Sequence, residues 1–255
     1  MIRSVLDDKE IVTERGTEIL KKLFDNKSIA DYPKSVELIK KLIHLGTNFS
    51  DIILDFFAGS GTTAHAVMEL NKEDSGNRKF ILVQLPEPCD EDSEAYKAGY
   101  KTIADICKDR IRRAGKKIQQ EINEINKFKE DQLEFEKPVE KQIDLGFKVF
   151  KLSESNFKQW RPLRKNNSEE IKEAILEFKD NLQTDATTEN ILYELMLKNG
   201  KILTDKIVKK NDYYIIGENE IVFILETINE TIIDEILKLK PQKVIVLDKL
   251  FYGND

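Results

Sequence analysis

The sequence predicts an α/β protein, and three observations support this prediction. A short apolar run, Ile52–Leu54, leads into the glycine-containing turn Asp55–Thr63, which is the pattern of a buried strand followed by a helix. A second apolar run, Phe80–Val83, follows at the distance typical of a βαβ unit, so the two strands should be parallel. Elsewhere apolar residues recur at three- and four-residue spacing, which is typical of helices packed on a core.

The elements before and around this unit follow in order. A polar entry segment, residues 1–31, should contain one short helix at about Thr17–Phe24. The next helix is predicted by five apolar residues at helical spacing: Val36, Leu38, Ile39, Leu42 and Ile43. The strand Asp51–Phe56, a helix at Thr63–Leu70 and the strand Phe80–Val83 complete the βαβ unit.

A long helical stretch is expected after this unit. Helical spacing predicts a helix over Ala95–Ala114, and isoleucines up to Ile125 predict a further helix, with Gly115 as a candidate break. Lys127–Lys141 is dense in charge and fits either a linker or the polar face of a packed helix. The alternating run Gly146–Leu152 predicts a strand.

Composition changes after Trp160–Pro162, which indicates a second, smaller α/β domain. We therefore divide the chain into the entry segment 1–31, a cofactor-binding part 32–150 and a C-terminal domain 151–255. The C-terminal elements expected are helices at 168–181, 187–198 and 230–239, a hairpin of strands 213–216 and 221–225, and a last strand at 244–247.

Composition limits the classes of protein to consider. The chain has 255 residues, 40% of them hydrophobic, which is enough to bury a core. Two cysteines give no disulfide framework, and we find neither a membrane-length apolar run nor a signal-peptide core, so a cytoplasmic protein with no membrane partner is expected. The net charge of −6 means that a nucleic-acid partner needs a local basic patch.

The turn Asp55–Thr63 carries the strongest chemical signal. Gly59 and Gly61 let the backbone turn sharply near a ligand, and Ser60, Thr62 and Thr63 are candidate caps of the next helix. The same turn, read with Ala64, fits a relaxed dinucleotide fingerprint, so an NAD site is an alternative. Asp55 would repel a pyrophosphate but suits a cationic amino group, and Gln84 stands where NAD proteins place an acid, so the pattern favours S-adenosylmethionine. A purely structural glycine turn also stays open.

Several segments together resemble a known family. They are Tyr32–Ile39, Asp55–Val67, Asn77–Pro88, Tyr96–Ile106, Arg110–Gly115, Leu145–Phe150 and, more loosely, Asp248–Asp255. In this order they are similar to the modification subunit of type III restriction-modification systems, a β-class adenine-N6 DNA methyltransferase. The resemblance implies a partial Rossmann-like fold that binds S-adenosyl-L-methionine. The residues it assigns to the cofactor are Lys34, Ser35, Asp55, Phe57, Gly59, Ser60, Gly61, Thr62 and Gln84.

One family motif is missing from this sequence. The family holds a flipped adenine with Asp or Asn followed by Pro-Pro and an aromatic residue. The six prolines here, at positions 33, 86, 88, 138, 162 and 241, are never adjacent. The resemblance therefore implies the C-terminal part of a modification subunit, from a split gene or a shortened chain, that does not methylate DNA alone. The partners it implies are duplex DNA, an N-terminal catalytic and target-recognition part, and a restriction subunit or a second copy of the chain.

A basic run adds a candidate DNA contact. Between Lys108 and Lys117 there are six basic residues and one Asp. The candidate phosphate contacts are Arg110, Arg112, Arg113, Lys116 and Lys117. A solvated helix face is the alternative. For the whole chain the alternatives to a methyltransferase part are a non-catalytic assembly module of a restriction-modification complex and a nicotinamide-dependent enzyme.

Overall fold

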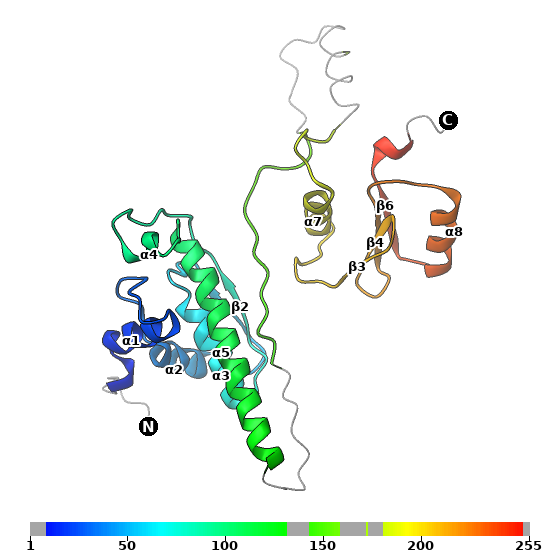
Figure 1. The fold of residues 1–255 in the computed structure, drawn as a ribbon. Helices are drawn as coiled ribbons and strands as arrows, with labels where there is room; N and C mark the ends of the chain where they lie inside the picture. The colour runs from blue at the N-terminus through cyan, green and yellow to red at the C-terminus, as the bar shows by residue number, and fades with distance from the viewer. Residues whose placement is uncertain (1–8, 132–142, 159–171, 173–180, 252–255) are drawn as a thin grey trace. The chain divides into compact units, whose positions relative to one another are not determined.

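The computed structural model describes residues 9–131, 143–158, 172 and 181–251. The chain divides into two compact units, Met1–Phe147 and Lys148–Asp255 (Figure 1). Both mix helices with β-strands, so the predicted α/β class is confirmed. That residues 32–150 act as the cofactor-binding part stays a prediction. No described helix combines the length and apolar character that a membrane crossing requires.

The described residues of the first unit form one sheet and four longer helices. Its elements are η1 (Lys9–Ile11), α1 (Thr13–Leu23), α2 (Val36–Gly46), β1 (Ile52–Asp55), α3 (Thr62–Asp74), β2 (Lys79–Leu82), α4 (Glu94–Lys97) and α5 (Ile103–Asp131). Strands β1 and β2 pair in parallel, with Ile53 opposite Phe80, which confirms the predicted βαβ unit.

Among the described residues of the first unit, helices cover one face of the β1–β2 sheet. Ile53, Phe80 and Leu82 point to α2, α3 and α5, where they pack on buried residues such as Val67 and Met68. Figure 1 shows α3 and α5 side by side, and the two helices contact each other along their length. The residues of the opposite face are exposed; they are Ile52, Leu54, Phe56, Ile81, Val83 and Leu85.

Helix α1 approaches the start of α2 through a glycine. A Cβ on Gly16 would lie 2.2 Å from the Pro33 carbonyl oxygen, so only glycine fits here. This contact fixes the chain that leads into Lys34 and Ser35.

Three sequence-based expectations differ from the structure. The helix expected over Ala95–Ala114 is broken between α4 and α5, where Gly99 has a φ of 97° that a helix cannot include. Helix α5 instead runs through Gly115 without interruption, and a Cβ at this position would make only ordinary van der Waals contacts, the nearest at 3.4 Å from the Leu145 carbonyl oxygen. The strand predicted at Gly146–Leu152 is wrong, since these residues form no regular structure.

The second unit has three layers. Its elements are α7 (Thr188–Lys198), β3 (Ile207–Lys209), β4 (Tyr213–Ile216), β5 (Ile221–Ile224), α8 (Glu230–Leu239), β6 (Lys243–Val246) and η2 (Asp248–Phe251). The sheet order is β3-β4-β5-β6. The predicted hairpin is confirmed as the antiparallel pair β4–β5, and β6 adds in parallel. Strand β3 was not predicted, and the helix expected at 168–181 falls almost wholly outside the described residues.

Candidate cofactor and nucleic-acid sites

The glycine turn lies between β1 and α3, with a backbone that side chains rarely tolerate. Gly59 and Gly61 have φ values of 52° and 82°, in the left-handed region. A Cβ on Gly61 would also lie 3.0 Å from the Cys107 Sγ and 3.2 Å from its carbonyl oxygen. Gly61 is thus required both by conformation and by the close approach of α5.

Asp55 is fixed at the carboxyl end of β1. Its Oδ1 accepts a hydrogen bond from the Phe57 N–H at 3.0 Å, and its Oδ2 accepts one from the Thr63 hydroxyl at 2.5 Å. In open parallel sheets ligands bind outside the carboxyl ends of the strands. The structure therefore holds one half-buried carboxylate at the place where such a ligand would lie.

Gln84 connects the second strand to the same turn. Its Oε1 accepts from the Gly59 N–H at 2.7 Å, and its Nε2 donates to the Leu85 carbonyl at 3.1 Å. An amide oxygen has two lone pairs and an amide nitrogen two hydrogens, so each group retains one more hydrogen-bonding position. Contact with a ribose stays a prediction, and the observed role of Gln84 is to support the turn.

The hydroxyls of the turn do not cap α3, contrary to our expectation. The N-cap of α3 is Gly61, and no N-cap side chain accepts a hydrogen bond from the first backbone N–H groups of the helix. Thr63 donates to Asp55 instead, while Ser60 and Thr62 accept from Arg110. The hydroxyls are therefore used to connect the turn to charged side chains on both sides.

Arg110 is the residue whose position differs most from the sequence-based interpretation. It is 0% exposed, so it cannot contact a DNA phosphate at the surface in this structure. Its Nη1 donates to the Ser60 Oγ at 2.9 Å and to the Thr62 Oγ1 at 2.7 Å. Burial lowers the pKa of Arg110 to about 10, which leaves it charged at neutral pH. Its spacing from Cys107, Ile111 and Ala114, the buried face of α5, is the sequence signal for this position.

The side chains of Phe57, Lys34 and Ser35, the remaining predicted cofactor residues that carry side chains, make none of these hydrogen bonds. Phe57 is 90% exposed at the tip of the turn. Lys34 is exposed, and Ser35 is buried at the start of α2, where its hydroxyl accepts from the Leu38 N–H at 3.4 Å. The hydrogen bonds thus join Asp55, Gly59, Ser60, Thr62 and Gln84 to one turn, whereas Lys34 and Ser35 belong to the α2 entry loop.

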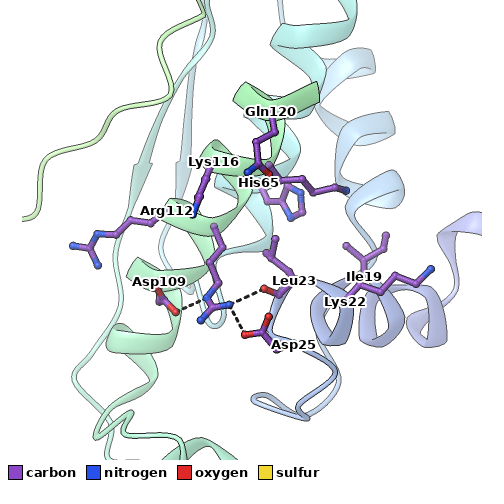
Figure 2. Close-up of a pocket in the computed structure, with 11 residues that line it drawn as sticks. Ile19, Lys22, Leu23, Asp25, His65, Asp109, Arg112, Lys116 and Gln120 are labelled. Atoms are coloured by element: carbon purple, nitrogen blue, oxygen red, sulfur yellow. Dashed lines mark hydrogen bonds and ion pairs between the residues drawn. The ribbon is translucent and has the colours of Figure 1, made fainter. Parts of the chain in front are cut away.

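A basic pocket lies on another side of α5. It has a volume of about 780 Å³ and is lined by Ile19, Lys22, Leu23, Asp25, His65, Asp109, Arg112, Arg113, Lys116, Lys117 and Gln120. Figure 2 shows Lys22 and Ile19 of α1 across from Lys116 and Gln120 of α5, with His65 of α3 between them. Burial lowers the pKa of His65.

The cationic side chains around this pocket differ in whether their charge is already paired with acidic groups. Arg113 donates to Asp109 at 2.8 Å, to Asp25 at 3.0 Å and to the Leu23 carbonyl at 3.1 Å, so it anchors α5 to the end of α1 (Figure 2). Arg112 lies 5.4 Å from the Phe147 ring centroid. Lys116 and Lys117 are exposed, and the Lys117 Nζ lies 3.5 Å from a Glu121 carboxylate oxygen. Arg112, Lys116 and Lys117 are exposed enough for phosphate contact, with Lys117 already paired once, and Arg113 is largely neutralised by its partners.

Comparisons with known proteins agree with the family resemblance inferred from the sequence motifs. A family model described as DNA methylase matches residues 12–88, which include the glycine turn and β2. The chain is 48% identical over 106 residues to the type III restriction-modification enzyme StyLTI Mod subunit of Salmonella typhimurium, which is 42% of this chain and 16% of that protein. It is 44% identical over 115 residues to the type III EcoPI Mod subunit of Escherichia phage P1, or 45% of this chain and 18% of that protein.

A relative of a different type is also similar. The type II methyltransferase M.KpnI of Klebsiella pneumoniae is 41% identical over 110 residues, 43% of this chain and 26% of that protein. The matches thus cover less than half of this chain and about a quarter or less of the relatives. Within that span the resemblance to modification subunits of type III restriction-modification systems is confirmed, and residues 12–88 carry the pattern of a DNA methylase.

Proposed function

We propose that this chain supplies the S-adenosylmethionine-binding part of a DNA adenine-N6 methyltransferase of the type III restriction-modification kind. The observation that carries the proposal is the turn between β1 and α3, where a fixed carboxylate, Asp55, precedes two left-handed glycines at the carboxyl edge of a parallel sheet. The DNA methylase match includes this turn, which supports the reading.

Asp55 and Gln84 favour this cofactor over a dinucleotide. Two negative phosphates would meet the Asp55 carboxylate, whereas the amino group of a methionine would be attracted to it. A dinucleotide also needs an acidic ribose acceptor at the end of the second strand. That position holds Gln84, whose amide oxygen already accepts from Gly59.

Titration calorimetry tests the cofactor assignment. We expect the chain to bind S-adenosylmethionine and not NAD. Asp55→Asn keeps the size of the side chain and an oxygen acceptor but removes the charge, so it should weaken binding about 10-fold or more. Asp51→Asn, on the opposite end of β1, is the matched control and should leave the affinity unchanged. NAD binding, or equal affinity in the Asp55 variant, would contradict the assignment.

We also propose that the adenine-holding part comes from residues outside this sequence, and that they cover the bare face of the β1–β2 sheet. Parallel sheets are normally covered on both faces, and two strands rarely suffice for a stable sheet. Here the described residues provide two strands, and six apolar side chains of one face are exposed. No two prolines of the sequence are adjacent, which supports a Pro-Pro motif supplied by another segment.

Methyl transfer from labelled S-adenosylmethionine to duplex DNA tests this completion. The chain alone should be inactive, and co-expression with the StyLTI Mod subunit lacking its matched segment should give activity. Leu54→Glu together with Ile81→Glu should abolish that gain, because both side chains lie on the bare face. Leu237→Glu, an exposed leucine of α8, serves as the control. Activity of the chain alone would disprove this part of the proposal. A dimer of the chain that the double variant dissociates would show that a second copy covers the bare face.

DNA contact through α5 completes the proposed function. Each phosphate contact releases counterions, so the logarithm of the binding constant should fall linearly with the logarithm of salt concentration. Lys116→Gln with Lys117→Gln should reduce that slope by about 1.8 if both lysines contact phosphates. The pair Lys238→Gln with Lys240→Gln in the second unit is the control. An unchanged slope in the α5 variant would indicate that this helix face is only solvated.

A further inference from the structure

Arg110 is a buried cation whose hydrogen bonds are incomplete. Within the described part of the chain, three buried side-chain atoms have no hydrogen-bond partner: His65 Nδ1, Arg110 Nε and Arg110 Nη2. No ion pair joins Arg110 to an acidic residue in that same part. A buried charge without a counter-charge destabilises a fold, and an apolar side chain of similar volume would pack at this position at lower cost. The charge of Arg110 therefore needs an explanation other than stability.

The contacts that Arg110 does make lead directly to the cofactor turn. Its Nη1 donates to the hydroxyl oxygens of Ser60 and Thr62, on either side of Gly61. A hydroxyl that accepts a hydrogen bond from a cation keeps its own hydrogen available and becomes a better donor. Ser60 is only half-buried, so its hydroxyl hydrogen can be directed to a ligand.

The turn also lies between two opposite charges. Burial raises the pKa of the Cys107 thiol to about 11, and both Arg110 and Asp55 act on that thiol, in opposite directions. The Cys107 Sγ in turn lies against Gly61. The hydrogen bonds show the same arrangement: Asp55 binds the turn at Phe57 and Thr63, and Arg110 binds it at Ser60 and Thr62. An anion and a cation that flank one turn match the two charges of an amino-acid zwitterion.

We propose that Arg110 is a positioning residue that directs the Ser60 hydroxyl to the carboxylate of a zwitterionic ligand end, while Asp55 faces its ammonium group. This inference rests on the proposed cofactor and assigns the recognition of its methionine carboxylate. The positive charge of Arg110 acts through Ser60, because the guanidinium itself is buried.

The test compares two ligands in calorimetric titrations of the full chain: S-adenosylmethionine and its decarboxylated analogue, which keeps the ammonium and sulfonium groups. The wild type should prefer the carboxylate-bearing ligand about 10-fold or more. Arg110→Met should lose this preference by weakening the first ligand only, and its melting temperature should be equal or higher. Arg110→Lys, which keeps a cationic donor, should restore part of the preference, and Arg15→Met, at a half-exposed arginine of α1, is the control.

Ser60→Ala keeps the proposal testable if Arg110→Met does not fold, because it leaves the buried arginine in place. It should remove the same preference. An unchanged preference in Ser60→Ala, or an equal loss for both ligands in Arg110→Met, would overturn the role of Arg110 and leave the cofactor assignment intact. If the wild type binds neither ligand, the cofactor assignment fails, and this inference fails with it.

Discussion

The two sheets of this protein differ in how they are covered. In the second unit, α7 packs on one face of the sheet and α8 on the other, so every residue of β4 and β5 is buried. In the first unit, exposed and half-buried residues alternate along β1 and β2, because helices cover one face only. The second sheet is a complete three-layer core within one stretch of chain.

The difference shows that apolar strands do not by themselves indicate a finished core. Ile81 and Ile216 are the same residue type in strands of equal length, yet Ile81 is 51% exposed and Ile216 is 0% exposed. An exposed apolar patch of this kind is typical of an interaction surface. The first unit therefore has the composition of a buried sheet without the layer that would bury it.

The largest expected effect comes from a matched pair of truncations. Ile216→Ala should lower the free energy of unfolding of the second unit by about 2–5 kcal/mol, because it opens a cavity in a closed core. Ile81→Ala should change that of the first unit by less than about 1 kcal/mol. Urea unfolding, followed by hydrogen exchange of peptides from each unit, separates the two. A large cost for Ile81→Ala that depends on protein concentration would show that the bare face is covered by self-association.

The next largest expected effect is that a fall in pH lowers the stability of the first unit before that of the second. Both histidines of the sequence lie in the first unit, and burial lowers the pKa of His65. Below pH 6.5 the unfolded chain binds a proton that the folded unit does not, so stability must fall as pH drops. We expect a loss of up to about 1.4 kcal/mol per pH unit in that range for the first unit only.

Hydrogen exchange at pH 7.5, 6 and 5, corrected for intrinsic rates, measures this loss, and His65→Gln should remove it. The second unit should stay unchanged until its carboxylates titrate. Burial would raise the pKa of Glu194, but Lys198, Ser155 and Asn156 outweigh it and lower the pKa to about 2. Its contribution is therefore lost only as pH falls from about 4.5 to about 2. Equal losses in both units between pH 7 and 5 would contradict the assignment to His65.

The smallest effect concerns how the helices begin. The N-cap of α8 is Asn229, whose side chain accepts from the Ile232 N–H at 3.0 Å, whereas α3 begins at Gly61 without a side-chain cap. Asn229→Ala should lower the melting temperature of the second unit by a few degrees, since a cap contributes about 1 kcal/mol. Asn229→Asp keeps an acceptor and should melt near the wild type. A wild-type melting temperature for the alanine variant would mean that the cap is not needed.

Much of the fold was predictable because its signals are local. The spacing of apolar residues predicted α2, α7 and α8, and the runs at 52–54 and 80–83 predicted a parallel pair. The wrong predictions have physical causes that the spacing of apolar residues does not reveal. Gly115, a candidate break, lies in a continuous helix, and the alternation at Gly146–Leu152 predicted a strand where the chain has no regular structure. Alternation predicts a strand only where a neighbouring strand can pair.

The candidate site likewise has features that the sequence predicted and features that only the tertiary structure shows. The sequence by itself determined the order of Asp55, the two glycines and the hydroxyls, because a turn after a strand is encoded within a few residues. Only the tertiary structure decided that Arg110, far along the chain, is buried against Ser60 and Thr62, and that one face of the β1–β2 sheet is bare. Helical spacing can indicate that Arg110 is buried, but which distant segment it contacts depends on how the helices pack, and no local pattern specifies that.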